Sequence, residues 1–143
     1  MQTYLSRFTL IFCLLATAAG CGDAAGPQRS LGSAAGLYLL ASVNGESLPA
    51  NDPYLPISGS IYLWPTGHAE RHVTYRMSDG RSETLESAGS FHFENGALVL
   101  ELHSTGQYAP DSWSVSGTLD HGKLIIGYPG AADGEIIEEY HKR

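Results

Sequence analysis

The chain has 143 residues, of which 43% are hydrophobic, and its eight Lys or Arg stand against fifteen Asp or Glu, for a formal net charge of −7. This acidic balance disfavours nucleic acids and anionic lipid headgroups as partners, because both repel a negatively charged surface. The length suffices for one domain with its own hydrophobic core.

The first twenty residues have the layout of a secretory signal. One basic residue, Arg7, precedes a largely apolar run from Phe8 to Ala19 and then small residues. As a helix, those twelve residues would be about 18 Å long, whereas the hydrocarbon core of a bilayer is about 30 Å thick. We therefore expect residues 1–20 to be a signal peptide and not a permanent membrane span.

The sequence Ala18-Ala19-Gly20-Cys21 resembles the lipobox of bacterial lipoproteins, which is cut so that the cysteine becomes an acylated N-terminus. Ala18 replaces the usual Leu, so ordinary cleavage near Ala18 or Gly20 is the alternative. Two or three acyl chains would anchor a domain at a bilayer, at about 0.8 kcal/mol per buried CH₂. The resemblance implies a cell-envelope protein lipidated at Cys21. Gly22 after the cysteine implies the outer membrane, facing the periplasm or the cell surface.

Residues 21–35 comprise this cysteine and a segment without aromatic or β-branched residues. Such a composition predicts a flexible linker, and fourteen residues of random coil span about 20 Å root-mean-square. Cys13 would leave with the signal and Cys21 would be acylated, so we expect no disulfide in the mature domain. Because Arg7 also leaves, the mature chain would carry a formal charge of −8.

The remaining residues, 36–143, alternate apolar with polar side chains between recurring turn signals, which is typical of an all-β domain. Two hairpins are expected at 90–103 and 112–128. Further strands are expected at 37–43, 57–64, 68–77, 82–88 and 136–140. Because a closed barrel leaves no exposed strand edge, eight or nine such strands predict a small antiparallel up-and-down β-barrel.

The two hairpins have tight turns that set their pairing. Type I′ turns at Asn95-Gly96 and His121-Gly122 would gather apolar residues on one face of each hairpin. The second turn would also set Asp120 opposite Lys123 as a cross-strand ion pair. The expected inward pairs are Phe93 with Leu98, Phe91 with Leu100, Leu119 with Leu124, Gly117 with Ile126 and Val115 with Tyr128.

The turn at residues 78–80 allows two registers for the strands on either side of it. One pairs Arg76 with Glu83. The other pairs Val73 with Leu85 and His72 with Glu86. The sequence does not choose between them, so the register of residues 71–88 stays open.

The domain opens with the pattern G-x-Y-x-L-x-x-V-N-G-x-x-L-P, formed by Gly36, Tyr38, Leu40, Val43, Asn44, Gly45, Leu48 and Pro49. With the later order of strands and turns, residues 36–143 resemble small bacterial lipocalin-like lipoproteins of uncharacterised function. The resemblance implies a lipocalin-like barrel. True lipocalins have Trp where Tyr38 stands, and a helix near the C-terminus where this chain has a strand. Because of these two differences, the resemblance implies the fold more than it implies any carrier function.

The segment HAERH is the sharpest candidate for a metal site. On a strand His68, Glu70 and His72 share one face, but the two histidines lie about 13 Å apart at 3.3 Å per residue. Both cannot reach one ion at a ligand distance of about 2 Å. One His-Glu pair joined by His92 or His103 is the alternative. We interpret the segment as a solvated outer face and predict no metal.

No motif for catalysis stands out. The chain lacks a G-x-S-x-G elbow, a mature cysteine beside a histidine and a phosphate-binding glycine loop. Glu138 and Glu139 point to opposite faces of a strand, which argues against a carboxylate dyad, and we interpret both as surface charge. We therefore predict a protein without catalytic residues or cofactor.

An eight-stranded barrel is either filled by side chains or holds one small ligand, and the many large residues here favour a filled core. Any cavity should be lined by Phe91, Phe93, Leu98, Leu100, Trp113, Val115 and Ile126. Two hypotheses follow. A dry cavity of a few hundred Å³ would favour a carrier or sensor of a small apolar ligand. A filled core with an exposed apolar patch above about 400 Å² would favour a structural module that binds another envelope protein.

Overall fold

The structure is a computed structural model that describes residues 29–49, 55–106, 112–129 and 134–143. The predicted signal peptide and Cys21 lie outside the described residues. The elements are α1 (Leu31–Ala34), β1 (Gly36–Val43), β2 (Glu46–Ser47), β3 (Pro56–Leu63), β4 (His68–Arg76), β5 (Ser82–Glu94), β6 (Ala97–Ser104), β7 (Ser112–Asp120), β8 (Lys123–Pro129) and β9 (Glu135–Lys142). Within these ranges no helix has the length and apolar character needed to span a bilayer.

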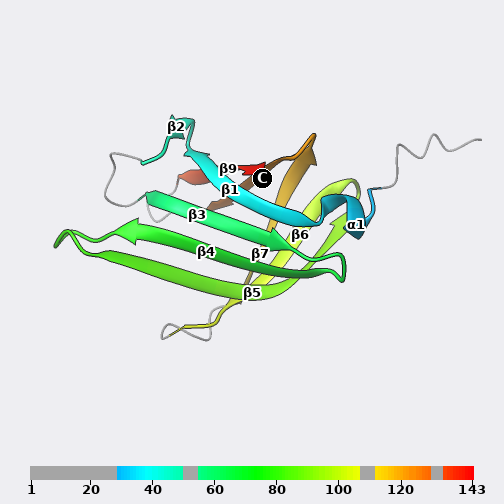
Figure 1. Ribbon diagram of the computed structural model, residues 1–143, viewed down its shortest axis with the longest axis horizontal. Helices are drawn as coiled ribbons and strands as arrows, with labels where there is room; N and C mark the ends of the chain where they lie inside the picture. The colour runs from blue at the N-terminus through cyan, green and yellow to red at the C-terminus, as the bar shows by residue number, and fades with distance from the viewer. Residues whose placement is uncertain (1–28, 50–54, 107–111, 130–133) are drawn as a thin grey trace, which may run out of the picture.

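The strands form an antiparallel up-and-down barrel (Figure 1). From β3 to β9 each strand pairs with the next along the chain, and β1 closes the cylinder by pairing with both β3 and β9. The short β2 is an additional strand beside the end of β1. The prediction of an all-β barrel of eight or nine strands is therefore confirmed.

Three of the tight turns have the same backbone conformation. Asn44-Gly45, Asn95-Gly96 and His121-Gly122 have positive φ angles at both positions, as type I′ turns require. The predicted pairs of Phe91, Phe93, Gly117 and Leu119 are all present. The pairing of β7 with β8 spans Gly117–Asp120 and Lys123–Ile126 and does not reach the predicted pair of Val115 with Tyr128.

The predicted ion pair between Asp120 and Lys123 is wrong, although the two residues face each other in register. Lys123 Nζ lies 2.9 Å from a carboxylate oxygen of Glu139 on β9 instead. Asp120 contacts His121 at 2.9 Å and Arg29 at 3.9 Å. Lys123 contacts Glu139 and not Asp120 because closure of the barrel brings β9 beside β8, which places a second carboxylate within reach of Lys123.

The register between β4 and β5 is the one that pairs Val73 with Leu85 and His72 with Glu86. Strand β5 runs unbroken through two segments that the sequence separated, with Gly89 between them. A Cβ on Gly89 would overlap the carbonyl oxygen of Glu101 on β6. Glycine at this point therefore lets the two backbones approach closely within a continuous strand.

Helix α1 lies within the segment predicted to be a flexible linker. Ser30 caps it, accepting a hydrogen bond from Ser33 N at 3.1 Å. The Tyr38 hydroxyl donates to the Ala34 carbonyl at 2.6 Å, and Ala34 is fully buried. The apolar surface of Leu31 and Ala34, although small, suffices to dock one helical turn on the core.

The barrel has two different ends. We call the end that carries α1 and the turns 64–67, 95–96 and 121–122 the α1 end, where Arg29 contacts Gly96 and Asp120. We call the opposite end, where β6 and β8 finish and β7 and β9 begin, the mouth. Between them the core is packed with apolar side chains: Tyr38, Leu40, Val43, Ile61, Leu63, Ala69, Phe91, Leu98, Leu100, Leu102, Val115, Leu119, Leu124, Ile126 and Tyr140.

Candidate functional site

A cluster of polar side chains lies inside the barrel between this core and the mouth. We call it the Arg71 cluster; its members are Arg71 on β4, Tyr128 on β8, and Glu138 and Tyr140 on β9. Strand alternation explains the inward position of Arg71, because its neighbours Glu70 and His72 face outward. Only 6% of Arg71 and 0% of Glu138 is exposed. Two opposite charges are thus buried together.

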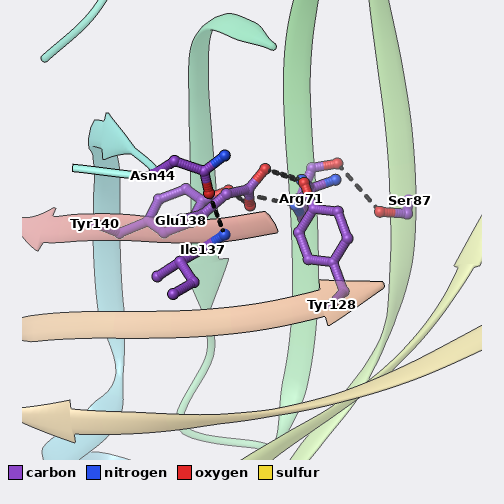
Figure 2. A network of polar contacts seen from close by, with 7 residues as sticks. All are labelled: Asn44, Arg71, Ser87, Tyr128, Ile137, Glu138 and Tyr140. Carbon is purple, nitrogen blue, oxygen red and sulfur yellow. Dashed lines mark hydrogen bonds and ion pairs between the residues drawn. The ribbon is translucent and has the colours of Figure 1, made fainter. Parts of the chain in front are cut away.

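The carboxylate of Glu138 is the centre of the cluster (Figure 2). Its Oε1 accepts hydrogen bonds from Arg71 Nη2 at 2.6 Å and from the Tyr128 hydroxyl at 2.5 Å. Its Oε2 accepts one from the Tyr140 hydroxyl at 2.6 Å. Arg71 Nε also lies 3.3 Å from the Tyr140 hydroxyl. Four side chains from three strands therefore hold one another in a single arrangement.

The cluster shifts the ionisation of its members. Burial raises the pKa of the Tyr128 and Tyr140 hydroxyls, and the negative charge of Glu138 raises both further. Burial alone would lower the pKa of Arg71, but interactions with Tyr140 and Glu138 outweigh it and raise that pKa well above its ordinary value. The tyrosines are therefore neutral donors, and Arg71 is a permanent cation.

Two aromatic rings flank the guanidinium of Arg71. Its central carbon lies 5.4 Å from the ring centre of Trp113 and 5.7 Å from that of Tyr128, within the range of cation–π attraction. The two rings lie 6.3 Å apart at 50°. They fix the plane of the guanidinium from the side of β7 and β8.

A cavity of about 170 Å³ opens beside the Arg71 cluster at the mouth. Arg71, Trp113 and Tyr128 form one part of its lining. The residues that complete the lining come from β4, β5 and β6: Tyr75, Leu85, Glu86, Ser87 and Ser104. Ser87 is itself buried and donates to the Arg71 carbonyl at 3.5 Å. The cavity thus combines aromatic walls with one cation and two serine residues.

Of the seven residues expected to line a cavity, only Trp113 lines this one. The buried residues Phe91, Leu98, Leu100, Val115 and Ile126 belong to the packed core, and Phe93 packs against it. A role in ligand binding stays a prediction for these residues. The difference arises because these apolar side chains pack against one another in the core, whereas the mouth cavity lies beside the Arg71 cluster.

His68, Glu70 and His72 lie on the outer face, as their spacing on a strand indicates, but the interpretation of the whole HAERH segment as a solvated face is wrong for Arg71, which points into the barrel. His68 Nε2 lies 3.4 Å from Glu70, and His72 lies 3.8 Å from Glu70 and 3.6 Å from Glu86. Among the residues that the structure describes, no group of three His, Cys, Asp or Glu side chains has the arrangement of a metal site.

The interpretation of Glu138 as surface charge is wrong. Alternation does place Glu138 and Glu139 on opposite faces, but the face of Glu138 is the barrel interior, beside Tyr140 and Arg71. The missed signal was an inward-facing charge on each of two strands: Arg71 between outward Glu70 and His72, and Glu138 in register with Ile126. Two opposite charges on inward faces predict a buried pair.

Comparisons of the chain with protein-family models, with curated proteins and with solved structures find no match. Functional inference for this chain therefore rests on the geometry of its own residues.

Proposed function

We propose that this protein is a lipid-anchored lipoprotein of the cell envelope, with a lipocalin-like barrel that binds a small, largely apolar ligand at its mouth. The cavity beside Arg71 carries the proposal, because it joins aromatic walls to a few fixed polar groups. Ligand sites have this combination, in which apolar walls give affinity and polar groups give orientation.

The volume of the cavity limits the ligand. Drug-sized molecules occupy pockets of about 300–1,000 Å³, whereas a ring the size of benzene fills a cavity of about 150 Å³. At about 170 Å³, the mouth cavity suits one ring with a small substituent. The same volume is too small for a long acyl chain.

The position of the cavity fits a tethered protein. The described chain begins at Arg29, at the α1 end, whereas the cavity opens at the opposite end. Eight residues lead from Cys21 to Arg29, and they reach at most about 29 Å. A lipid on Cys21 would therefore hold the α1 end near the bilayer and leave the mouth open to the surrounding solution.

We assign no catalytic step to this site. The two buried charged groups, Arg71 and Glu138, are 2.6 Å apart and bonded to each other, and Arg71 is a permanent cation that cannot act as an acid. Glu138 is also fully buried and holds two tyrosine hydroxyls. The cluster is suited to shaping the floor of a binding site and not to proton transfer with a substrate.

Native mass spectrometry of the purified protein, with thermal unfolding in the presence of single-ring compounds, tests ligand binding. We expect a co-purified small molecule or a rise in melting temperature. Leu85→Trp should abolish either signal, because Leu85 lines the cavity and is 41% exposed. Leu39→Trp is the matched control, at 42% exposure on β1 outside the cavity lining. An empty protein that no ring compound stabilises would leave the protein-binding module as the better hypothesis.

The lipid anchor has a separate test. Cys21→Ser should move the protein from the membrane fraction to the soluble fraction, because no acyl chain can be attached. Metabolic labelling with palmitate should mark the parent protein, which has Cys21, and not the Cys21→Ser variant. Continued membrane retention of the variant would contradict the anchor while leaving ligand binding untouched.

A further inference from the structure

We infer that the mouth cavity selects a neutral, planar ligand whose carbonyl oxygen accepts a hydrogen bond from Nη1 of Arg71. The inference rests on the proposed function and adds the chemical class of the ligand. It follows from three properties of Arg71: its unused donor, its balanced charge and the rings beside it.

The unused donor is found by accounting for the guanidinium nitrogens. Nε donates toward Tyr140, and Nη2 donates to Glu138 and lies 3.5 Å from the Tyr128 hydroxyl. Nη1 makes no hydrogen bond to the described residues, and yet these residues contain no fully buried side-chain nitrogen or oxygen without a partner. Nη1 therefore reaches accessible space, and the space that Arg71 lines is the mouth cavity.

A donor in this position selects for an acceptor. The rest of Arg71 is buried and fixed by three side chains, so Nη1 cannot turn to meet a distant partner. A ligand without an acceptor would shield this nitrogen from water and leave a cation's donor unpaired, which costs affinity. A carbonyl oxygen matches it with one lone pair in the plane of the guanidinium.

The charge of the site favours a neutral acceptor over a carboxylate. The positive charge of Arg71 is already balanced by Glu138 at 2.6 Å, inside the barrel. A carboxylate at Nη1 would place a second negative charge close to Glu138, which is fully buried beside the cavity. Like charges at this range repel strongly where water is scarce. The acidic chain as a whole adds to the repulsion.

The planar shape follows from the walls. Trp113 and Tyr128 present rings beside the guanidinium, and Tyr75 and Leu85 line the cavity from β4 and β5. Flat faces of this kind bind an aromatic or conjugated ring by offset or edge-to-face contact. Benzamide has the required size, planarity and neutral carbonyl oxygen and is therefore the probe of choice.

The fluorescence of Trp113 reports binding directly. The chain has two tryptophans, and the ring of Trp64 packs at a tilt against those of Tyr62 and His68, near the turn at the α1 end. Trp64→Phe in the full-length protein leaves Trp113 as the reporter. We would titrate this protein at neutral pH with benzamide, benzoate and toluene, which have similar shapes but carry a neutral acceptor, an anionic acceptor and no acceptor.

We expect benzamide to bind at least about tenfold more tightly than toluene or benzoate, as one charge-assisted hydrogen bond requires. Equal binding of toluene, or tighter binding of benzoate, would overturn the inference and leave the proposed binding function standing. Failure of all three probes would count against both.

A conservative variant adds a second measurement. Arg71→Lys keeps a positive charge for Glu138 but removes the planar fork and Nη1. We expect it to bind toluene as before and to lose the preference for benzamide. An undiminished preference in this variant would overturn the assignment of Nη1. Should the variant fail to fold, the order of the three probes in the parent protein still decides.

Discussion

Arg71 Nη2 and Glu138 Oε1 lie 2.6 Å apart in the interior of the barrel, although 67 positions separate the two residues in the chain. A buried pair of this kind contributes little net stability compared with well-packed apolar residues, because both charges lose their hydration. Each charge is nevertheless costly to leave alone. The pair therefore restricts how β4, β8 and β9 can meet, and it keeps one donor of Arg71 at the mouth.

Removal of one partner should be far more damaging than replacement of both. Glu138→Ala leaves Arg71 buried without a counter-charge and should lower the free energy of unfolding by about 3–5 kcal/mol. The double variant Arg71→Met with Glu138→Gln should cost less, because the amide can still bond the two tyrosine hydroxyls. Urea unfolding measures both. Glu139→Ala is the control: this neighbour sits on the outer face, and its loss should cost less than about 1 kcal/mol.

High pH should unfold the protein through Tyr128 and Tyr140. Their folded pKa values are raised, so above the ordinary value of about 10 the unfolded chain loses these protons and the folded chain keeps them. Stability is therefore intact below pH 10 and falls above it, by up to about 1.4 kcal/mol per pH unit for each tyrosine.

Phenolate absorbance during alkaline titration checks this directly. Both hydroxyls should ionise only together with the loss of the β-sheet circular dichroism signal. Tyr128→Phe should make the fall in stability shallower, whereas Tyr62→Phe, at an exposed position, should leave it unchanged. Smooth ionisation of every tyrosine near pH 10 with the fold intact would contradict the burial of these two groups.

A methyl group at either of two strand glycines should destabilise the barrel. The Cβ of Gly89→Ala would overlap the Glu101 carbonyl, and that of Gly117→Ala would overlap the Ile125 carbonyl. Backbone cannot move aside as a side chain can, so each should cost about 1–3 kcal/mol. Thermal unfolding measures the effect. Gly106→Ala has open space around the new methyl group and should be nearly neutral.

The docking of α1 should depend on one hydroxyl. Tyr38→Phe removes the hydrogen bond to the Ala34 carbonyl and should cost about 0.5–1.5 kcal/mol. Faster amide hydrogen exchange at residues 33–35, with β6 and β7 still protected, would show that the loss is local. Unchanged exchange at these residues would mean that the apolar contacts of Leu31 and Ala34 alone hold the helix.

The two hairpins were predictable from the sequence, because the Asn-Gly and His-Gly turns and the alternation of Phe91, Phe93, Leu98 and Leu100 act between neighbours in the chain. The ion pair of Lys123 was not, because its partner Glu139 comes from a strand that only closure brings alongside. Helix α1 was missed for a similar reason, since one turn with two small apolar contacts has no sequence period of its own.

The sequence by itself determined most of the strands, the turns of the two predicted hairpins and the alternation of side-chain directions along a strand, because these depend on local backbone geometry and a two-residue period. Only the tertiary structure decided that inward Arg71 and inward Glu138 meet, that two tyrosines join them, and that a cavity remains beside them. Those facts depend on the closure of β1 on β9 and on how fully the core side chains fill the barrel. Both depend on many contacts between residues that are distant in the chain, and a local sequence pattern does not reveal such contacts.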